Sequence, residues 1–119
     1  MFDSKTVKPA NIVRVDIADD DALYAAYMAF ITNGGIFVQA HQLGAVSYTL
    51  GMDIYLLLHL KAENERWPVH GRVVWVSTLE DRQHATGCGV QFRDQGETRQ
   101  HLETLLNGRL QSDQPTLTL

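Results

Sequence analysis

The fold of this chain is decided by one stretch in its first third, Ile31-Thr32-Asn33-Gly34-Gly35-Ile36-Phe37-Val38. An Asn-Gly pair is the signature of a tight turn, because both residues tolerate the positive φ angles that such a turn requires. The residues after the glycines are apolar and suit a strand. The stretch therefore predicts a tight turn that leads directly into a β-strand.

Upstream of the turn, the stretch from Asn11 to Ile17 alternates apolar and polar residues. Its apolar positions share one face: Val13, Val15 and Ile17. This two-residue period is typical of a half-buried strand. Asp19-Asp20-Asp21 then precedes the alanine-rich run Ala22 to Met28, and aspartate is a favoured cap for a helix. We therefore expect a strand followed by a short aspartate-capped helical turn.

Further strands are predicted downstream, and the hydrophobic period changes near the end. Ile54 to Leu60 is apolar on both faces, as in a central strand, whereas Trp67 to Val76 and Thr86 to Phe92 alternate. From Glu97 the leucines follow the three-and-four spacing of an amphipathic helix, with Gly108 as its expected stop. These leucines are Leu102, Leu105, Leu106 and Leu110. The pattern predicts a mainly β domain with one C-terminal helix packed on the sheet.

Length and composition indicate one globular domain. The chain has 119 residues, of which 45% are hydrophobic and 20% charged, so it can build a single core. We expect a flexible N-terminus over residues 1–10, the domain over residues 11–110 and a flexible C-terminal tail over residues 111–119. The net charge of -4 offers no basic face for a nucleic acid, so we expect no nucleic-acid partner.

The N-terminal residues point to a cytoplasmic protein. Met1 to Ala10 contains no apolar run like that of a signal peptide, and apolar stretches such as Ile54 to Leu58 are far shorter than the ~20 residues of a spanning helix. The single cysteine, Cys88, fits a reducing compartment. We expect cytoplasmic localisation without membrane insertion.

No constellation of catalytic or metal-binding residues stands out. Cys88 lies between two glycines on the apolar face of a predicted strand, which favours a small core side chain over a nucleophile or redox switch. The histidines are scattered without metal-ligand spacing, and Ser47 and Ser77 lack a nucleophile-elbow context. We therefore predict no catalytic residues, no metal site, no cofactor and no enzymatic activity.

Three segments, taken in order and spacing, resemble those by which PilZ domains are recognised. They are Ile31 to Val38, Gly71-Arg72-Val73-Val74-Trp75 and Gly87-Cys88-Gly89-Val90-Gln91-Phe92. The resemblance implies a small antiparallel PilZ-type β-barrel of about six strands with a C-terminal α-helix. Ala22 to Phe30 is in addition similar to the divergent PilZ proteins of type IV pilus assembly.

Nucleotide-binding members of the PilZ family use two motifs that this chain retains only in part. An Arg-x-x-x-Arg segment precedes the barrel, and an Asp/Asn-x-Ser-x-x-Gly segment lies on its surface. Guanidinium groups stack on guanine and fork onto phosphates, while the carboxylate and hydroxyl groups contact base edges. On this chain Gly35 retains the glycine and Thr32 a hydroxyl, but Phe30 replaces the carboxylate or amide.

The arginine segment has no counterpart near the first predicted strand. No arginine occurs between Val15 and Glu65, and Asp19-Asp20-Asp21 stands where cations are expected. Like-sign charge disfavours a ligand with two phosphates, so we predict that cyclic di-GMP is not bound directly. A plain solvated helix cap is the alternative interpretation of the three aspartates.

The resemblance implies a non-enzymatic adaptor of type IV pilus biogenesis and twitching motility. The implied partners are the ATPase that drives pilus extension (PilB-like) and a signalling protein with cyclic di-GMP cyclase or phosphodiesterase-like domains (FimX-like). A cyclic di-GMP receptor with unconventional contacts is one alternative. A general structural or dimerisation domain is another.

Exposed aromatic residues are the first candidates for contacts with such partners. Tyr24 and Tyr27 lie three residues apart on a short turn, where both rings are hard to bury, and tyrosine is enriched at interfaces. Tyr24 is preferred because two alanines leave its surroundings flat. Trp67, beside a proline at a strand start, is a further candidate, whereas Trp75 is expected in the core.

The C-terminal tail provides a second candidate surface. Leu117 and Leu119 alternate with threonines after Pro115, a pattern that could add as a strand to a partner's sheet edge. An inert tail is the alternative interpretation.

Overall fold

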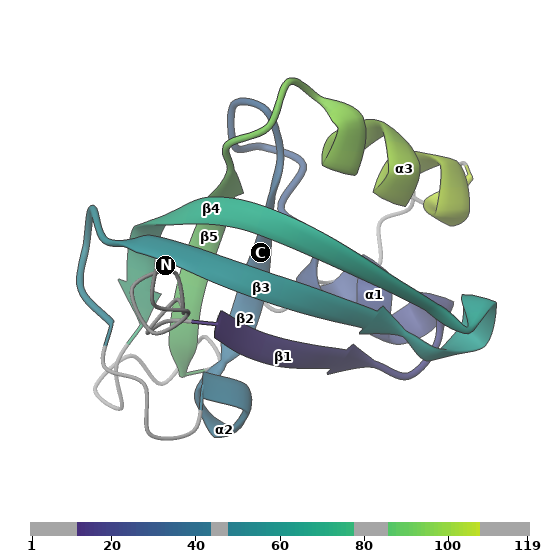
Figure 1. Cartoon of the computed structure of the whole chain (residues 1–119), viewed down its shortest axis with the longest axis horizontal. Helices are drawn as coiled ribbons and strands as arrows, with labels where there is room; N and C mark the ends of the chain where they lie inside the picture. The colour runs from purple at the N-terminus through teal and green to yellow at the C-terminus, as the bar shows by residue number, and fades with distance from the viewer. Residues whose placement is uncertain (1–11, 44–47, 78–85, 108–119) are drawn as a thin grey trace, which may run out of the picture.

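The computed structural model describes residues 12–43, 48–77 and 86–107 (Figure 1). In chain order its elements are β1 (Ile12–Ile17), α1 (Asp20–Ala26), β2 (Gly35–Gln39), α2 (Ala40–Leu43), β3 (Asp53–Leu60), the 3-10 turn η2 (Lys61–Glu63), β4 (Glu65–Ser77), β5 (Gly87–Phe92) and α3 (Glu97–Leu106). The predicted mainly β fold with a C-terminal helix is confirmed. The two flanking segments of the predicted domain organisation, residues 1–10 and 111–119, lie outside the described residues.

The strands form one five-stranded sheet in the order β1-β3-β4-β5-β2, curled into a half-barrel. In Figure 1, β1, β3 and β4 run side by side across the front, while β5 and β2 pass behind them. Most neighbours pair antiparallel as expected, but β1 pairs in parallel with β3. Parallel strands need a crossover instead of a hairpin. Here α1, β2 and α2 make up that crossover.

The two edge strands, β1 and β2, are bridged by the short helices. Both α1 and α2 contact β1 and β2. Gln42 of α2 also reaches the edge of β1, where its Oε1 accepts from the Asp16 N–H (2.8 Å) and its Nε2 donates to the Asp16 carbonyl (3.1 Å). The sequence pattern does not predict α2, which has only four residues.

The core lies on the inner face of the curled sheet and beneath α3. The predicted alternation of β1 is confirmed, with its three apolar positions at most 4% exposed. The strands and α3 contribute these further buried side chains: Ile54, Leu56, Leu58, Leu60, Val69, Val73, Val90, Phe92, Leu102 and Leu106. The sheet therefore has one buried face, and its opposite face along β3 is only partly covered among the described residues.

The turn that opens β2 has the predicted geometry. Asn33 and Gly34 have φ angles of 68° and 79°, and the Asn33 amide donates to the carbonyls of Phe92 (2.9 Å) and Asp94 (2.7 Å). A Cβ atom on Gly35 would lie 2.7 Å from the Val90 carbonyl oxygen. The turn is thus fixed against the end of β5 by a side-chain amide and by close backbone packing.

In both longer helices an aspartate carboxylate accepts from backbone N–H groups at the helix start. Asp19 accepts from the Ala22 N–H (2.9 Å), which confirms the predicted cap of α1. At α3 the Asp94 carboxylate accepts from the N–H groups of Gly96 (3.0 Å) and Thr98 (3.2 Å). The C-cap of α3 is Asn107, with a φ of 34°. Gly108, the expected stop, lies outside the described residues.

Candidate functional site

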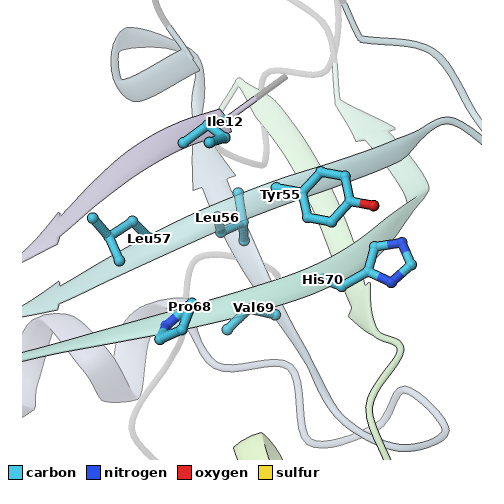
Figure 2. A pocket seen from close by; sticks show the side chains of 7 residues that line it. All are labelled: Ile12, Tyr55, Leu56, Leu57, Pro68, Val69 and His70. Atoms are coloured by element: carbon cyan, nitrogen blue, oxygen red, sulfur yellow. The ribbon is translucent and has the colours of Figure 1, made fainter. Parts of the chain in front are cut away.

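The outer face of β1, β3 and β4 carries a shallow apolar depression of about 370 Å³. Successive strand residues point to opposite faces, so the neighbours Leu56 and Val69 enter the core while alternate residues face outward (Figure 2). We call the outward-facing set the outer groove: Ile12, Tyr55, Leu57, Pro68 and His70.

The outer groove is accessible and has a defined end. The side chain of Ile12 is 54% exposed and that of Tyr55 is 43% exposed. The Tyr55 ring stacks on His70 with a centroid distance of 4.7 Å, and His70 Nε2 lies 3.6 Å from Asp53 Oδ1. Exposed apolar patches with polar rims are typical of protein interaction sites. The groove is therefore suited to contact another protein.

Pro68 is compatible with its strand because of where it lies. A proline lacks the N–H that an internal strand needs on both sides. Leu57 faces Pro68 in the β3–β4 register, but β4 pairs with β5 only from Gly71 onward. Pro68 thus lies in the half of β4 that has one neighbouring strand, where it widens the apolar surface without breaking the sheet.

The loop predicted to correspond to the nucleotide motif has neither a carboxylate nor an amide at its first position. The Phe30 side chain is 56% exposed there, Thr32 is exposed and Gly35 is buried. Gln91 Nε2 donates to the Thr32 carbonyl (2.9 Å), which ties the loop to β5. An exposed phenyl ring can stack on a flat group, but it cannot accept a hydrogen bond from a base edge.

The three aspartates are accounted for by helix α1. Asp19 is its N-cap, and Asp20 and Asp21 occupy the first turn, where the helix dipole favours negative charge. This geometry supports the interpretation of the aspartates as a helix cap.

Comparison with known families now places the chain. The PilZ domain model matches residues 5–108. The chain belongs to the PilZ family. PilZ domains are binding and adaptor domains, which gives this protein a regulatory role related to cyclic di-GMP. A search of curated proteins finds no match to the chain.

The prediction of an exposed tyrosine in this PilZ domain is wrong. Tyr24 is 6% exposed and Tyr27 is 3% exposed. Tyr27 follows the last helical residue and has extended backbone angles (φ -70°, ψ 134°). Its side chain therefore does not continue the helical spacing from Tyr24. Its hydroxyl donates to Glu103 Oε2 (2.6 Å), and its ring stacks with Phe92. Both rings are buried because the chain changes direction between them.

Burial and the neighbouring Glu103 carboxylate raise the pKa of the Tyr27 hydroxyl well above its ordinary value of 10. The neutral phenol is thus favoured in the folded state. Its contribution to stability is fully present below pH ~10 and is lost as the pH rises further.

The Tyr27→Phe variant tests this link between burial and alkaline stability. We expect it to cost about 1 kcal/mol of unfolding free energy at neutral pH, because the Glu103 carboxylate loses one of its two donors and keeps Arg99 Nε at 3.1 Å. Above pH ~10 the difference from the wild type should narrow. Urea unfolding across this range measures both effects. Burial also raises the pKa of Cys88 to about 11, but Cys88 is present in both proteins and cancels. A difference that stays constant with pH would contradict the assignment.

The two tryptophans have structural partners. Trp67, predicted to be exposed, is half-buried: its Nε1 donates to Thr98 Oγ1 (2.9 Å), and its ring stacks on His101 at 4.1 Å. Trp67 therefore attaches α3 to β4, which corrects the prediction of a freely exposed aromatic. Trp75, predicted in the core, is partly buried with its ring 6.0 Å from Phe37.

The remaining candidate residues are placed as follows. Cys88 is fully buried, which confirms it as a small core side chain. Among the described residues, no group of three or more potential metal ligands comes together, and no helix is both long and apolar enough to cross a membrane. The tail candidates for partner contact lie outside the described residues, so their role stays a prediction: Pro115, Leu117 and Leu119. Ser47 also lies outside the described residues, and the expectation that it is not a nucleophile stays a prediction.

The outer groove was missed at the level of sequence. Its residues come from three strands, and each strand shows only one or two exposed apolar positions. One usable signal was the apolar second face of Ile54 to Leu60, which suggested a covered strand. In the part of the chain that the structure describes, that second face is the centre of the groove.

Proposed function

We propose that this PilZ domain is a non-enzymatic adaptor of type IV pilus biogenesis and twitching motility. In this role it binds other proteins and does not bind cyclic di-GMP itself. The observation that carries the proposal is the exposed Phe30 ring at the position where nucleotide-binding relatives have a carboxylate or amide. The chain keeps the turn of the motif and lacks the carboxylate or amide at its first position.

The retained residues of the motif have roles in folding, which supports this proposal. Gly35 packs against the Val90 carbonyl, and the Thr32 carbonyl is bound by Gln91. A loop whose glycine and backbone serve the sheet can persist without a ligand. The nucleotide would then be bound by a partner, and this domain would transmit the partner's state.

The outer groove is our candidate contact surface for the proposed partners. These are the pilus-extension ATPase (PilB-like) and the signalling protein with cyclase or phosphodiesterase-like domains (FimX-like). Two partners require two surfaces if they bind together. Pro115, Leu117 and Leu119 in the C-terminal tail remain candidates for the second surface.

A charge in the groove should weaken partner binding. We expect Tyr55→Asp to lower the affinity for one of the two purified partners by about ten-fold or more, since it buries a carboxylate in an apolar contact. Biolayer interferometry with immobilised partner measures this. Leu50→Asp is the matched control, because Leu50 is 66% exposed and lies outside the groove. Equal affinities of both variants and the wild type for both partners would refute the groove as the contact surface.

One observation favours a second candidate function, a cyclic di-GMP receptor with unconventional contacts. Arg72 on β4 pairs with Gln91 on the neighbouring strand β5, and Gln91 donates to the Thr32 carbonyl of the motif loop. One strand therefore separates this arginine from the motif loop. Isothermal titration of the full chain with cyclic di-GMP separates the two functions. The adaptor proposal expects no binding heat, whereas micromolar binding that is lost in Arg72→Ala would establish the receptor.

A further inference from the structure

Two exposed arginines flank the outer groove. Arg66, Pro68, His70 and Arg72 alternate along β4 and therefore share its outer face. Both arginines are exposed, and no ion pair among the described residues involves either of them. The two are six positions apart along the strand, which corresponds to about 20 Å. The apolar floor of the groove occupies the space between them.

The neighbouring carboxylates offset the charge of this pair only in part. Arg14 on β1 is bound by Asp16 at 3.0 Å, so these two largely cancel. Asp53 on β3 lies directly opposite Arg72 in the β3–β4 register, but its Oδ1 is 3.6 Å from His70 Nε2 and it forms no ion pair with Arg72. The whole chain has a net charge of -4, yet this face carries three exposed arginines (Arg14, Arg66 and Arg72) against two exposed aspartates (Asp16 and Asp53). The positive charge is therefore local to the groove.

We propose that the outer groove binds a segment of a partner protein in which apolar side chains are flanked by carboxylates. The inference rests on the proposed function in that it specifies the partner chemistry for that same surface. The apolar floor would supply burial, while Arg66 and Arg72 would select the partner through charge complementarity.

A second copy of this chain fits the groove less well than an acidic partner does. In a two-fold dimer the same patch is used by both molecules, so a contact between two grooves would bring Arg66 and Arg72 of one molecule close to the same pair of arginines of the other. Like charges facing each other disfavour such a contact. The charge pattern thus selects a different protein with negative charge at its rim.

Labelled peptides test the inference directly. The probes share one apolar centre of leucine and phenylalanine, flanked on both sides by aspartate, serine or lysine pairs. Fluorescence polarisation with the full chain should show the aspartate-flanked peptide binding about ten-fold more tightly than the lysine-flanked one. The selectivity should decrease as salt is raised, because exposed charges are screened.

Variants separate the effect of the arginines from that of net charge. The double variant Arg66→Ala/Arg72→Ala lowers the net charge by two and should abolish the selectivity. The control variant Gln100→Glu/Thr104→Glu lowers the net charge by the same amount, at two exposed positions of α3 outside the groove. It should keep the selectivity. A control variant that loses as much selectivity as the arginine variant would overturn the inference.

The remaining outcomes are also decisive. Equal binding of the three peptides, or no binding of the aspartate-flanked one, would overturn the inference, as would a concentration-dependent dimer that is lost in Tyr55→Asp. If the groove prefers the aspartate-flanked peptide but neither purified pilus partner binds, the pilus function is contradicted and the inference about an acidic partner segment is supported. If Tyr55→Asp disrupts partner binding but the three peptides bind with equal affinity, the groove is supported as the contact surface and the preference for an acidic partner is contradicted.

Discussion

Replacing Gly71 with alanine is expected to lower the free energy of unfolding by about 3 kcal/mol. A Cβ atom at this position would lie 2.2 Å from Val90 Cγ1 and 2.9 Å from the Gln91 carbonyl oxygen. Val90 is fully buried and branched at Cβ, so it cannot turn away without disturbing the core. Urea unfolding monitored by circular dichroism measures the change.

Gly51→Ala is the matched control for this experiment. Gly51 has a φ of +86°, but no atom of the described residues lies within 4 Å of the position that a Cβ atom would take, so only backbone strain opposes the substitution. That strain costs about 1 kcal/mol. A loss at Gly71 no larger than the loss at Gly51 would show that β4 and β5 are less closely packed than the structure indicates.

Tyr24→Ala is expected to cost about 3–4 kcal/mol of unfolding free energy. The ring is 6% exposed and belongs to the main core cluster, so its removal leaves a cavity. Tyr55→Ala is the comparison on the protein surface. Its ring is 43% exposed, and we expect a cost of less than about 1 kcal/mol. Thermal or urea unfolding of the two variants measures the contrast.

This contrast decides how binding experiments on the two tyrosines are read. A partner lost on Tyr24→Ala would reflect a damaged fold, whereas a partner lost on Tyr55→Ala would reflect a lost contact. If Tyr24→Ala left the unfolding transition unchanged, the ring would be at the surface, and Tyr24 would again be a candidate for partner contact.

The sequence predicted those parts of the fold that depend on neighbours in the chain. The alternation of Val13, Val15 and Ile17 predicted β1, and the pair Asn33-Gly34 predicted the turn before β2. The Asp19 cap was predicted because its hydrogen bond spans only three residues. Local geometry is encoded within a few residues, so short patterns are sufficient to detect it.

The parts that were missed depend on contacts distant in the sequence. The parallel pairing of β1 with β3 joins Ile12 to Tyr55. The outer groove forms only because that pairing and the β3–β4 hairpin bring apolar residues together. The buried tyrosine rings depend in the same way on α3, whose Glu103 accepts from Tyr27. No single segment contains these signals.

The structure therefore places the candidate site in the outer groove and not at the tyrosines of α1. The prediction that Phe30 replaces a carboxylate or amide rests on the sequence alone, and the structure adds that the ring is exposed. The arginines of β4 are plain in the sequence, but their position beside the groove is apparent only with the strand register. A surface built from three strands can be recognised only when the order and register of those strands are known.

The bond between Gln42 and the edge of β1 has a consequence for the behaviour of the protein at high concentration. A strand with a bare edge can recruit the strands of other molecules and start fibre growth. The Gln42 amide offers Asp16 one acceptor and one donor, as a neighbouring strand would. A single side chain from α2 thus occupies a place on the edge of β1 where polymerisation could begin.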